Sequence, residues 1–469
     1  MMENSAGRRV VFGVMLSVFL AAMDATVVAT AMPMIAVRLG GLAIYAWVFS
    51  GYLLASTVSM PLWGWLSDLV GRRPVCLVGL LVFLVGSALA GAAGSMEALV
   101  AARMVQGLGA GSILTIGVTI VGDLFTLEKR ARLQGYASGV WGVASLLGPV
   151  AGGLLADYVS WRWVFYLNVP LGALGIALIA TSLRDAPRGR GRPVIDYAGL
   201  ALFAVGVTAT LLGVGEAGRA PVWWRTAVVL PLGVGVLALA AFVAVERRAR
   251  EPIVPLWLFG DRLILSAIVT GFLSGMAMFG AISFVPLFVL TVIGTSATHA
   301  GLVLAPFVLG WVALSILSAR LVFRLGYRAL VALGMGFLVL AFLQLTQWSA
   351  KLTTGEAMRD VLLAGIGMGL QSVPMLMAVQ SGVPHAYLGV ATSVTQFFRT
   401  VGAVVGLSVM GAVMARQLAA RAGMEEALHA VFITGFVVCL VALASALLVP
   451  AGTVRELARP DAAGSPGRA

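Results

Sequence analysis

Long apolar runs recur along the whole chain, and each is about the length needed to cross a lipid bilayer. A transmembrane helix takes about 20 apolar residues, and the first run, residues 10–35, exceeds that length. Hydrophobic residues make up 60% of the 469-residue chain and charged residues only 11%, against about 25% charged in soluble domains. A soluble core of this size could not hide so much apolar surface. The sequence therefore predicts an all-α integral membrane protein.

We predict fourteen transmembrane helices separated by short polar turns. They are expected at residues 10–35, 43–63, 74–94, 98–121, 135–157, 163–183, 197–216, 224–245, 263–290, 299–319, 327–347, 361–381, 390–414 and 428–449. An even number of spans puts both termini on one side of the membrane. Loops on that side carry about 21 Lys and Arg, against about 8 in the opposite loops. By the positive-inside rule, both termini are cytoplasmic.

The formal net charge of +12 is spread over short clusters between the apolar runs. This placement indicates membrane orientation rather than nucleic-acid binding. Nearly every cation is Arg, and the chain is rich in Ala, Gly and Val, which indicates a bacterial source and hence the plasma (inner) membrane. Cys76 and Cys439 both lie in apolar runs, so we expect neither a disulfide nor a metal site.

Two pairs of similar segments indicate an internal repeat. Residues 64–79 align with residues 319–334 at an offset of 255 residues, and the fifth and thirteenth spans align at an offset of 254. Parallel repeats of this kind, with substrate sites near the membrane midplane between the halves, are typical of transporters. The predicted divisions are a first six-helix bundle, a linker with two inserted helices, a second six-helix bundle and a disordered cytoplasmic tail, at residues 1–183, 184–262, 263–449 and 450–469.

Asp24 is the most unusual residue of the first span, because it lies near the middle of the apolar run. A charged side chain at the centre of a spanning helix costs roughly 2.5–3.5 kcal/mol on insertion scales. Such residues usually face a protein interior or a water-filled cavity and mark an ion or substrate path. No other predicted span has an acid near its middle, so Asp24 is the first candidate for proton and substrate binding.

The fourth span contains Arg103 and Gln106, which are three residues apart and therefore share a helix face. A desolvated guanidinium needs partners, and Asp24 is the candidate partner, directly or through water. The alternative is that Arg103 lies at a helix end and extends its guanidinium to the outer membrane surface.

The loop after the second span combines glycines with opposite charges. Glycines permit a tight turn and close backbone approach, and the charges can form a cluster at the helix ends that latches one conformational state. The alternative is a plain basic turn that only sets orientation. The gating residues that we assign are Gly64, Asp68, Gly71, Arg72, Arg73 and, at the end of the fourth span, Asp123.

The fifth span carries small residues at a spacing of four, which lets helices approach closely, and a proline that bends the helix. Such a helix could seal a central path and also rock, although glycine-rich faces serve ordinary packing too. The residues concerned are Gly148, Pro149, Gly152 and Gly153.

Five stretches of the chain resemble motifs of the major facilitator superfamily. Residues 64–73 resemble its signature loop, and residues 103–111 resemble its second motif, whose arginine is linked to proton coupling. Residues 142–153 resemble the signature of its antiporters, whereas residues 161–170 and 23–33 resemble its fourteen-helix drug:proton antiporter branch. The resemblance covers essentially the whole chain and implies that superfamily's fold, with protons as the coupling ion.

Several further side chains are candidates for lining a substrate cavity, because Met repacks readily and aromatic rings attract cations. For each of them, lipid contact or helix packing is the alternative. They are Trp47, Tyr52, Met276, Phe284, Gln371, Gln396 and Arg399. Arg399 in the thirteenth span is equally well explained as a structural anchor. We assign no role to His385.

The sequence thus predicts a proton-coupled antiporter that exports small amphipathic or cationic drugs by alternating access. Its partners are a small-molecule substrate and the bilayer, with no nucleic acid and no cofactor besides protons, and it is expected to work as a monomer. One alternative is export of a specific metabolite, lipid or antibiotic by the same fold. A membrane enzyme or sensor is the other, but no metal cluster, nucleophile constellation or nucleotide loop supports it.

Overall fold

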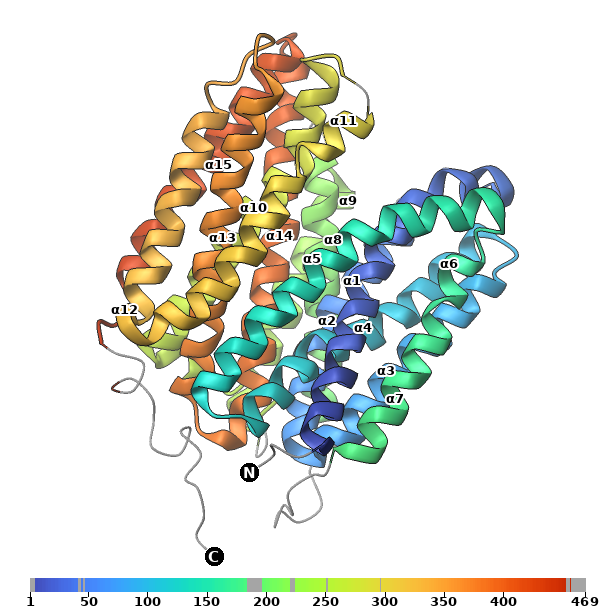
Figure 1. Ribbon diagram of the computed structural model, residues 1–469, viewed down its shortest axis with the longest axis vertical. Helices are drawn as coiled ribbons and strands as arrows, with labels where there is room; N and C mark the ends of the chain where they lie inside the picture. Colours follow the sequence, from blue (N-terminus) through green and yellow to red (C-terminus); the bar gives the residue numbers. More distant parts are fainter. Residues whose placement is uncertain are drawn as a thin grey trace, which may run out of the picture. The chain divides into compact units, whose positions relative to one another are not determined.

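The computed structural model describes the residues in the ranges 5–40, 44, 47–183, 196–219, 224–249, 252–295, 297–452 and 456. Within these ranges the regular elements are helices, and no strand occurs (Figure 1). Two parts of the predicted divisions lie outside the described residues: the first part of the linker, residues 184–195, and the tail apart from residues 450–452 and 456.

The long helices follow the apolar runs closely. They are α1 (Ser5–Leu39), α2 (Trp47–Val70), α3 (Arg72–Ala92), α4 (Met96–Leu124), α5 (Leu127–Tyr158), α7 (Asn168–Ser182), α8 (Tyr197–Arg219), α9 (Thr226–Glu246), α10 (Arg262–Thr291), α12 (Ala305–Leu345), α13 (Thr354–Gly382), α14 (Leu388–Ala419) and α15 (Met424–Leu447). The short elements are α6 (Trp163–Tyr166), η2 (Leu256–Gly260), α11 (Ala297–Leu302) and η3 (His385–Tyr387).

Eleven stretches of the described chain are long and apolar enough to cross a membrane, which confirms a multi-pass helical protein. Helices α2 and α5 are not among the eleven, and residues 299–345 count as one stretch although two spans are predicted there. Within α12, Gly326 has φ 75° and ψ 174°, so the helix breaks between the two predicted spans. The total of fourteen spans stays a prediction.

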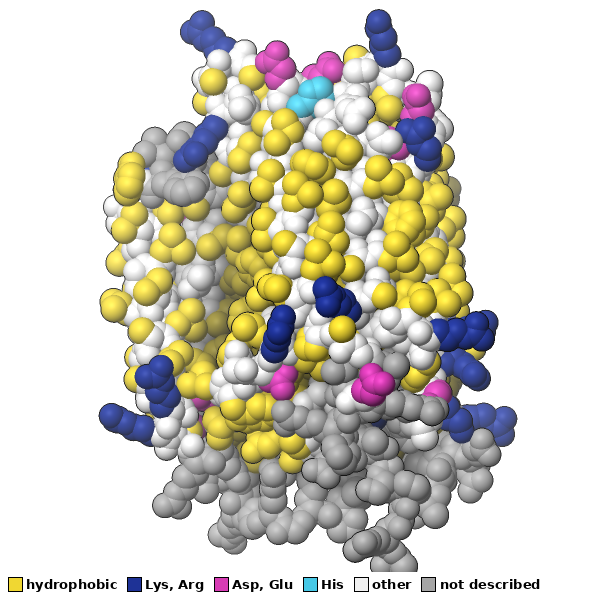
Figure 2. Space-filling view, turned by 90° about the vertical axis from the view of Figure 1, so that its left-hand side faces the viewer, with side chains coloured by type: hydrophobic (Ala, Val, Ile, Leu, Met, Phe, Trp, Pro, Cys, Tyr) yellow, Lys and Arg dark blue, Asp and Glu magenta, His cyan; other side chains and the backbone are white. Residues whose placement is uncertain are grey.

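Apolar side chains cover the middle of the face seen in Figure 2, and most charged side chains lie toward its two ends. Many large hydrophobic residues are exposed on the described helices; Leu237 of α9, for example, is 73% exposed. A soluble protein would not leave so many apolar side chains in water. The surface is that of a protein surrounded by lipid in its middle part.

The chain forms two compact units, each of which takes a short segment from elsewhere in the sequence. Unit 1 comprises Met1–Phe125, Gly139–Asp196 and His385–Val394, and unit 2 comprises Thr126–Ser138, Tyr197–Pro384 and Thr395–Ala469. Unit 1 therefore contains the N-terminal end of α14, and unit 2 the N-terminal end of α5. The predicted domain boundaries stay a prediction.

Within unit 1, glycines bring α4 into backbone contact with its neighbours. A Cβ atom at Gly107 would lie 2.3 Å from the carbonyl oxygen of Tyr52 in α2. A Cβ atom at Gly109 would lie 2.3 Å from the backbone nitrogen of Phe83 in α3. No side chain fits in either place, so α4 lies tightly against both helices. This packing fixes the height and rotation of Arg103 and Gln106 on α4.

The same glycine contacts recur in unit 2. A Cβ atom at Gly365 of α13 would lie 2.2 Å from the carbonyl oxygen of Phe307 in α12. Gly365 follows Gly107 by 258 residues, and Phe307 follows Tyr52 by 255 residues. The contact between α2 and α4 in unit 1 and the contact between α12 and α13 in unit 2 thus use glycines at equivalent positions. This agreement supports the internal repeat found in the sequence.

Candidate functional site

Asp24 lies at the centre of a buried polar network in unit 1. Its Oδ2 atom is 2.6 Å from Nη1 of Arg103, and its Oδ1 atom accepts a hydrogen bond of 2.8 Å from Nε2 of Gln106. The Asp24 and Arg103 side chains are 0% and 1% exposed. The structure therefore joins the three residues that the sequence singled out. Arg103 is directed toward Asp24 in the interior of the unit and not outward to the membrane surface.

Gln106 connects the two charges as well as contacting each of them. Its Oε1 atom accepts a hydrogen bond of 2.7 Å from Nη1 of Arg103, while its amide nitrogen donates to Asp24. The guanidinium also lies 4.1 Å from the ring centroid of Tyr52, a distance at which a cation is attracted to an aromatic face. Two uncharged groups, the Gln106 amide and the Tyr52 ring, thus contact the guanidinium of the ion pair.

Asn168 is a further member of the network that the sequence reasoning did not assign. Its Nδ2 atom donates to Oδ1 of Asp24 at 2.9 Å and lies 3.0 Å from Oγ of Ser87. Ser87 in turn donates to the carbonyl oxygen of Phe165 at 2.8 Å. The only available signal was its place in the stretch 161–170, which resembles the antiporter branch but does not reveal a partner 144 residues away.

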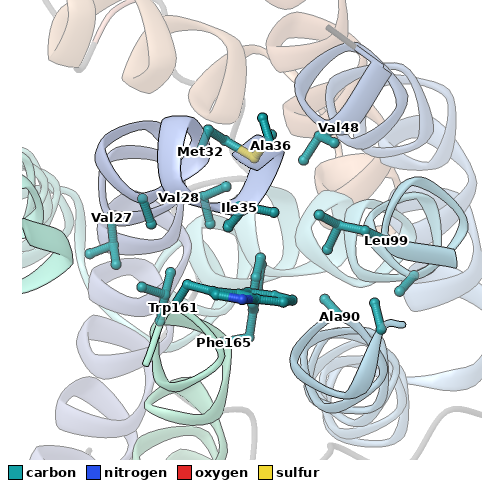
Figure 3. Close-up of a cluster of buried hydrophobic side chains, with 14 of the residues drawn as sticks. Val27, Val28, Met32, Ile35, Ala36, Val48, Ala90, Leu99, Trp161 and Phe165 are labelled. Carbon is teal, nitrogen blue, oxygen red and sulfur yellow. The ribbon is translucent and has the colours of Figure 1, made fainter. Parts of the chain in front are cut away.

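A cluster of apolar side chains covers the network in unit 1. Figure 3 shows Trp161 and Phe165 among aliphatic side chains of the surrounding helices, including Ile35 of α1 and Leu99 of α4. The Phe165 ring centroid is 6.0 Å from the central carbon of the Arg103 guanidinium. Trp161 is 6% exposed and Phe165 is fully buried. In this conformation the Asp24 carboxylate is shielded from solvent, and each of its oxygen atoms accepts a hydrogen bond from a neighbouring side chain.

The loop between α2 and α3 forms the charge cluster that the sequence predicts. Nε of Arg72 donates to Oδ2 of Asp123 at 2.6 Å, and its Nη1 atom forms an ion pair with Oδ1 of Asp68. Nη1 also donates to Oγ of Ser67 at 2.6 Å. Nε2 of His385 lies 3.2 Å from Oδ1 of Asp123, a contact that sequence reasoning missed because 262 residues separate the two. Arg72 therefore lies between two carboxylates.

Asp68 also contacts the N-terminal end of α14, which belongs to the same unit. Its two carboxylate oxygens accept hydrogen bonds from the backbone N–H groups of Gly389 and Val390, at 3.2 and 2.8 Å. The first N–H groups of a helix have no partner within the helix, and a negative charge there is favourable. A Cβ atom at Gly389 would lie 2.7 Å from the carbonyl oxygen of Gly64, so both glycines are needed for this approach.

The other residues of the loop have separate places. Gly71 lies between α2 and α3 and has φ 122°, a backbone conformation that residues other than glycine rarely adopt. Nη2 of Arg73 donates to the carbonyl oxygen of Ala180 in α7 at 2.7 Å. Gly71 thus allows the turn, and Arg73 ties the start of α3 to α7.

The equivalent positions of unit 2 form a neutral version of this cluster. Tyr327 follows Arg72 by 255 residues, and Ser381 follows Asp123 by 258 residues. The Tyr327 hydroxyl donates to Oγ of Ser381 at 3.1 Å. The ionic contact of the first repeat is therefore a hydrogen bond between uncharged groups in the second. The position equivalent to Arg103, Val361, is likewise uncharged and buried.

The glycines of the fifth span pack against α1 close to Asp24. A Cβ atom at Gly148 would lie 1.8 Å from Oγ1 of Thr26, and one at Gly152 would lie 2.1 Å from Oγ1 of Thr30. A Cβ atom at Gly153 would meet nothing within 4 Å. Pro149 lies within α5. Two of the glycines of the motif are therefore required for close contact with α1, and Gly153 is not.

The candidate cavity residues have different environments. Tyr52 contacts Arg103, as described above. Met276 and Phe284 of α10 and Gln371 of α13 are buried among the helices of unit 2, where a Cβ atom at Gly406 would lie 2.5 Å from Cα of Met276. Trp47, Gln396 and Arg399 are partly exposed. Their role as cavity residues stays a prediction, as does that of the other four.

Among the described residues, no group of three or more His, Cys, Asp or Glu side chains could hold a metal ion. Within each of the two clusters, the carboxylates pair with a guanidinium: Asp24 with Arg103, and Asp68 and Asp123 with Arg72. Such charge clusters can break and re-form as helices move.

Comparison with known proteins decides the family. The sequence profile of the Major Facilitator Superfamily matches residues 14–407. The chain belongs to the Major Facilitator Superfamily. The multidrug transporter protein MdtP of Bacillus subtilis is 36% identical to it over 413 residues, which cover 88% of this chain and 76% of that protein. A transporter of the acurin A biosynthesis cluster in Aspergillus aculeatus is 34% identical over 407 residues, which cover 85% of this chain and 73% of that protein.

The fold agrees with that assignment. The crystal structure of the human organic anion transporter TETRAN aligns with a TM-score of 0.67 at 20% identity, covering 95% of this chain and 100% of that one. At this identity the likeness shows the fold alone. The chain is accordingly a multi-pass membrane transporter of the Major Facilitator Superfamily. Members of this superfamily bind small-molecule substrates within the membrane and typically work as monomers.

Proposed function

We propose that the protein is a proton-coupled antiporter that exports small amphipathic or cationic compounds from a bacterial cytoplasm by alternating access. The observation that carries this proposal is the buried network of Asp24, Arg103, Gln106 and Asn168 in unit 1. The multidrug transporter among its relatives supports the cargo class. The protein would lie in the inner membrane with both termini cytoplasmic, as the distribution of Lys and Arg between loops indicates.

Protonation of Asp24 would change the network in a defined way. The neutral acid would lose its ion pair with Arg103, whereas Arg103 would keep the Gln106 oxygen at 2.7 Å and the ring of Tyr52. Asn168 and Gln106 both donate to Oδ1, so the added proton belongs on Oδ2, where Arg103 is bound. Proton binding and separation of the ion pair are therefore one event. A cationic cargo would compete for the carboxylate in the same way.

The cluster of Asp68, Arg72 and Asp123 would act as the gate. Asp68 links α2 to the first turn of α14 through two backbone N–H groups, so a movement of α14 away from α2 must break these bonds. The carboxylate would keep its ion pair with Arg72 after the break. Conformational change would then alternate between two arrangements of the same charges.

The test is proton-driven efflux of ethidium from proteoliposomes that contain the full-length protein, with and without an imposed pH gradient. We expect the gradient to accelerate wild-type efflux and Asp24→Asn to abolish the acceleration. The matched control is Glu97→Gln, which removes an exposed acid at the start of α4. We expect this variant to transport ethidium like the wild type. Normal gradient-driven efflux by Asp24→Asn would remove Asp24 from the mechanism.

A second candidate function is export of one specific metabolite, lipid or antibiotic by the same fold. The relative in a fungal biosynthesis cluster favours this reading. A panel of structurally unrelated compounds in counterflow separates the two functions. Acceleration by many amphipathic compounds supports a multidrug exporter, whereas acceleration by a single chemical class supports a dedicated one.

A further inference from the structure

Arg399 of α14 is a charged residue inside a predicted span that the antiport mechanism above does not use. It lies eleven residues after the start of α14, which at about 1.5 Å per residue is about 16 Å along the helix. The predicted span covers residues 390–414, so Arg399 lies inside it, toward its cytoplasmic end. An ionisable residue at this depth nearly always pairs with another group or marks a substrate path.

The structure gives the Arg399 side chain no partner among the described residues, where it takes part in no hydrogen bond and no ion pair. The arginines with structural roles differ from it in this respect. Nη1 of Arg162 donates to the carbonyl oxygens of Gly91 and Ala93, at 3.3 and 3.0 Å. Nε of Arg262 donates to the carbonyl oxygen of Leu448 at 3.2 Å. Arg399 is therefore not anchored in the way that a purely structural arginine of this chain is.

The backbone around Arg399 is nevertheless tightly held within unit 2. A Cβ atom at Gly275 of α10 would lie 2.1 Å from the Arg399 carbonyl oxygen. A Cβ atom at Gly402 would lie 2.0 Å from the carbonyl oxygen of Phe272. Helices α10 and α14 thus cross with their backbones in contact beside Arg399. The crossing fixes the base of a side chain that is itself partly exposed.

Aromatic rings lie next to this position. The Phe398 ring is 6.0 Å from that of Phe259 in η2, and the Phe397 ring is 5.6 Å from that of Phe203 in α8. A guanidinium presents five N–H donors in a plane that matches a carboxylate, which can bind in a bidentate manner. A guanidinium without a partner among the described residues, on a helix turn that also carries Phe397 and Phe398, suits an acid with an apolar body.

The charges elsewhere in the spans favour an anionic ligand too. Asp24, the one acid near the middle of a predicted span, is already neutralised by Arg103. A cation therefore finds no free carboxylate there until that pair opens, whereas an anion finds Arg399 unpaired. We propose that Arg399 is a binding residue for anionic cargo, so that the transporter accepts amphiphiles that carry a carboxylate. This inference rests on the proposed export function.

The test compares two dyes that differ in one group, a rhodamine with a free benzoate and the methyl ester of the same dye. Both are measured for gradient-driven efflux from proteoliposomes of wild type, Arg399→Gln and Arg399→Lys. We expect Arg399→Gln to slow export of the free acid at least about tenfold, which corresponds to about 1.4 kcal/mol, and to change export of the ester less than about twofold. Arg399→Lys should fall between, because it keeps the charge but not the planar fork.

The control variant is Arg416→Gln, which removes an exposed cation from the last turn of the same helix and should affect neither dye. An equal loss for both dyes in Arg399→Gln would overturn the proposal and identify Arg399 as a structural anchor. Unchanged export of both dyes would overturn it as well.

Direct binding separates this proposal from the export function and from binding of lipid. Fluorescence polarisation of the free-acid dye is measured with protein in nanodiscs of phosphatidylcholine, and again with phosphatidylglycerol added. Binding that weakens about tenfold in Arg399→Gln supports the anion site even if no proton-driven transport is found. Failure of the variant to change binding refutes the site. Loss of dye binding when the anionic lipid is added assigns Arg399 to a lipid phosphate and refutes the cargo role.

Discussion

The buried ion pair between Asp24 and Arg103 allows a quantitative test of the network. The perturbation is a double-mutant cycle of Asp24→Asn, Arg103→Gln and the two changes together. Each single change leaves one buried charge without its opposite charge. The double change removes both charges while keeping amide groups that can still form hydrogen bonds.

The structure sets the expected magnitudes. Removing one partner of a buried ion pair costs about 3–5 kcal/mol, and both side chains are at most 1% exposed. In Asp24→Asn, Arg103 keeps the Gln106 oxygen and the Tyr52 ring. In Arg103→Gln, Asp24 keeps two amide donors, from Gln106 and Asn168. We therefore expect the lower limit, about 3 kcal/mol, for each single change and a similar total for the double change.

The free energy of unfolding is measured in mixed micelles by titration with dodecyl sulfate and followed by circular dichroism. Near-equal destabilisation of the single and double variants gives a coupling energy of about 3 kcal/mol. A parallel cycle of Glu97→Gln with Arg103→Gln should be additive within about 0.5 kcal/mol, because Glu97 is exposed. If the effects of the Asp24 and Arg103 changes on the free energy of unfolding also add within about 0.5 kcal/mol, the two charges do not stabilise each other, and the proposed ion-pair coupling is refuted.

Two pairs of glycine substitutions test the α1–α5 contact and the break in α12. Gly148→Ala places a Cβ atom 1.8 Å from a threonine hydroxyl of α1, so we expect the free energy of unfolding to fall by about 1–3 kcal/mol in a thermal melt. Gly153→Ala places its Cβ atom in open space and should leave the melting curve nearly unchanged. Equal stabilities of the two variants would contradict the α1–α5 contact. Gly326→Ala imposes a side chain on a residue with φ 75° and 2.6 Å from a backbone oxygen, and should cost about 1–3 kcal/mol. Gly336→Ala, within a helix and with nothing nearby, should be neutral or slightly stabilising, and a reversal of this order would show that α12 does not break at Gly326.

Much of the architecture follows from the sequence, because lipid leaves a chain few choices. Backbone polar groups have no water to bond in a bilayer, so each long apolar run must form a helix. The positions of the long helices and the repeat at offsets near 255 residues were therefore accessible from apolar length and from recurring glycines. Asp24 was also recognisable, since a carboxylate in an apolar run is costly. Arg103 and Gln106 could be assigned to one helix face by their spacing alone.

Only the tertiary structure decided which groups meet. Asn168 donates to Asp24, His385 lies against Asp123, and Asp68 caps the start of α14, yet each contact joins helices far apart in the sequence. Helical periodicity defines a face but not the neighbour that covers it, because the neighbour depends on how glycines let several helices approach. The sequence by itself determined that Asp24 needs a partner. Packing of α4 against α2 and α3 selected Arg103 and Gln106 as those partners.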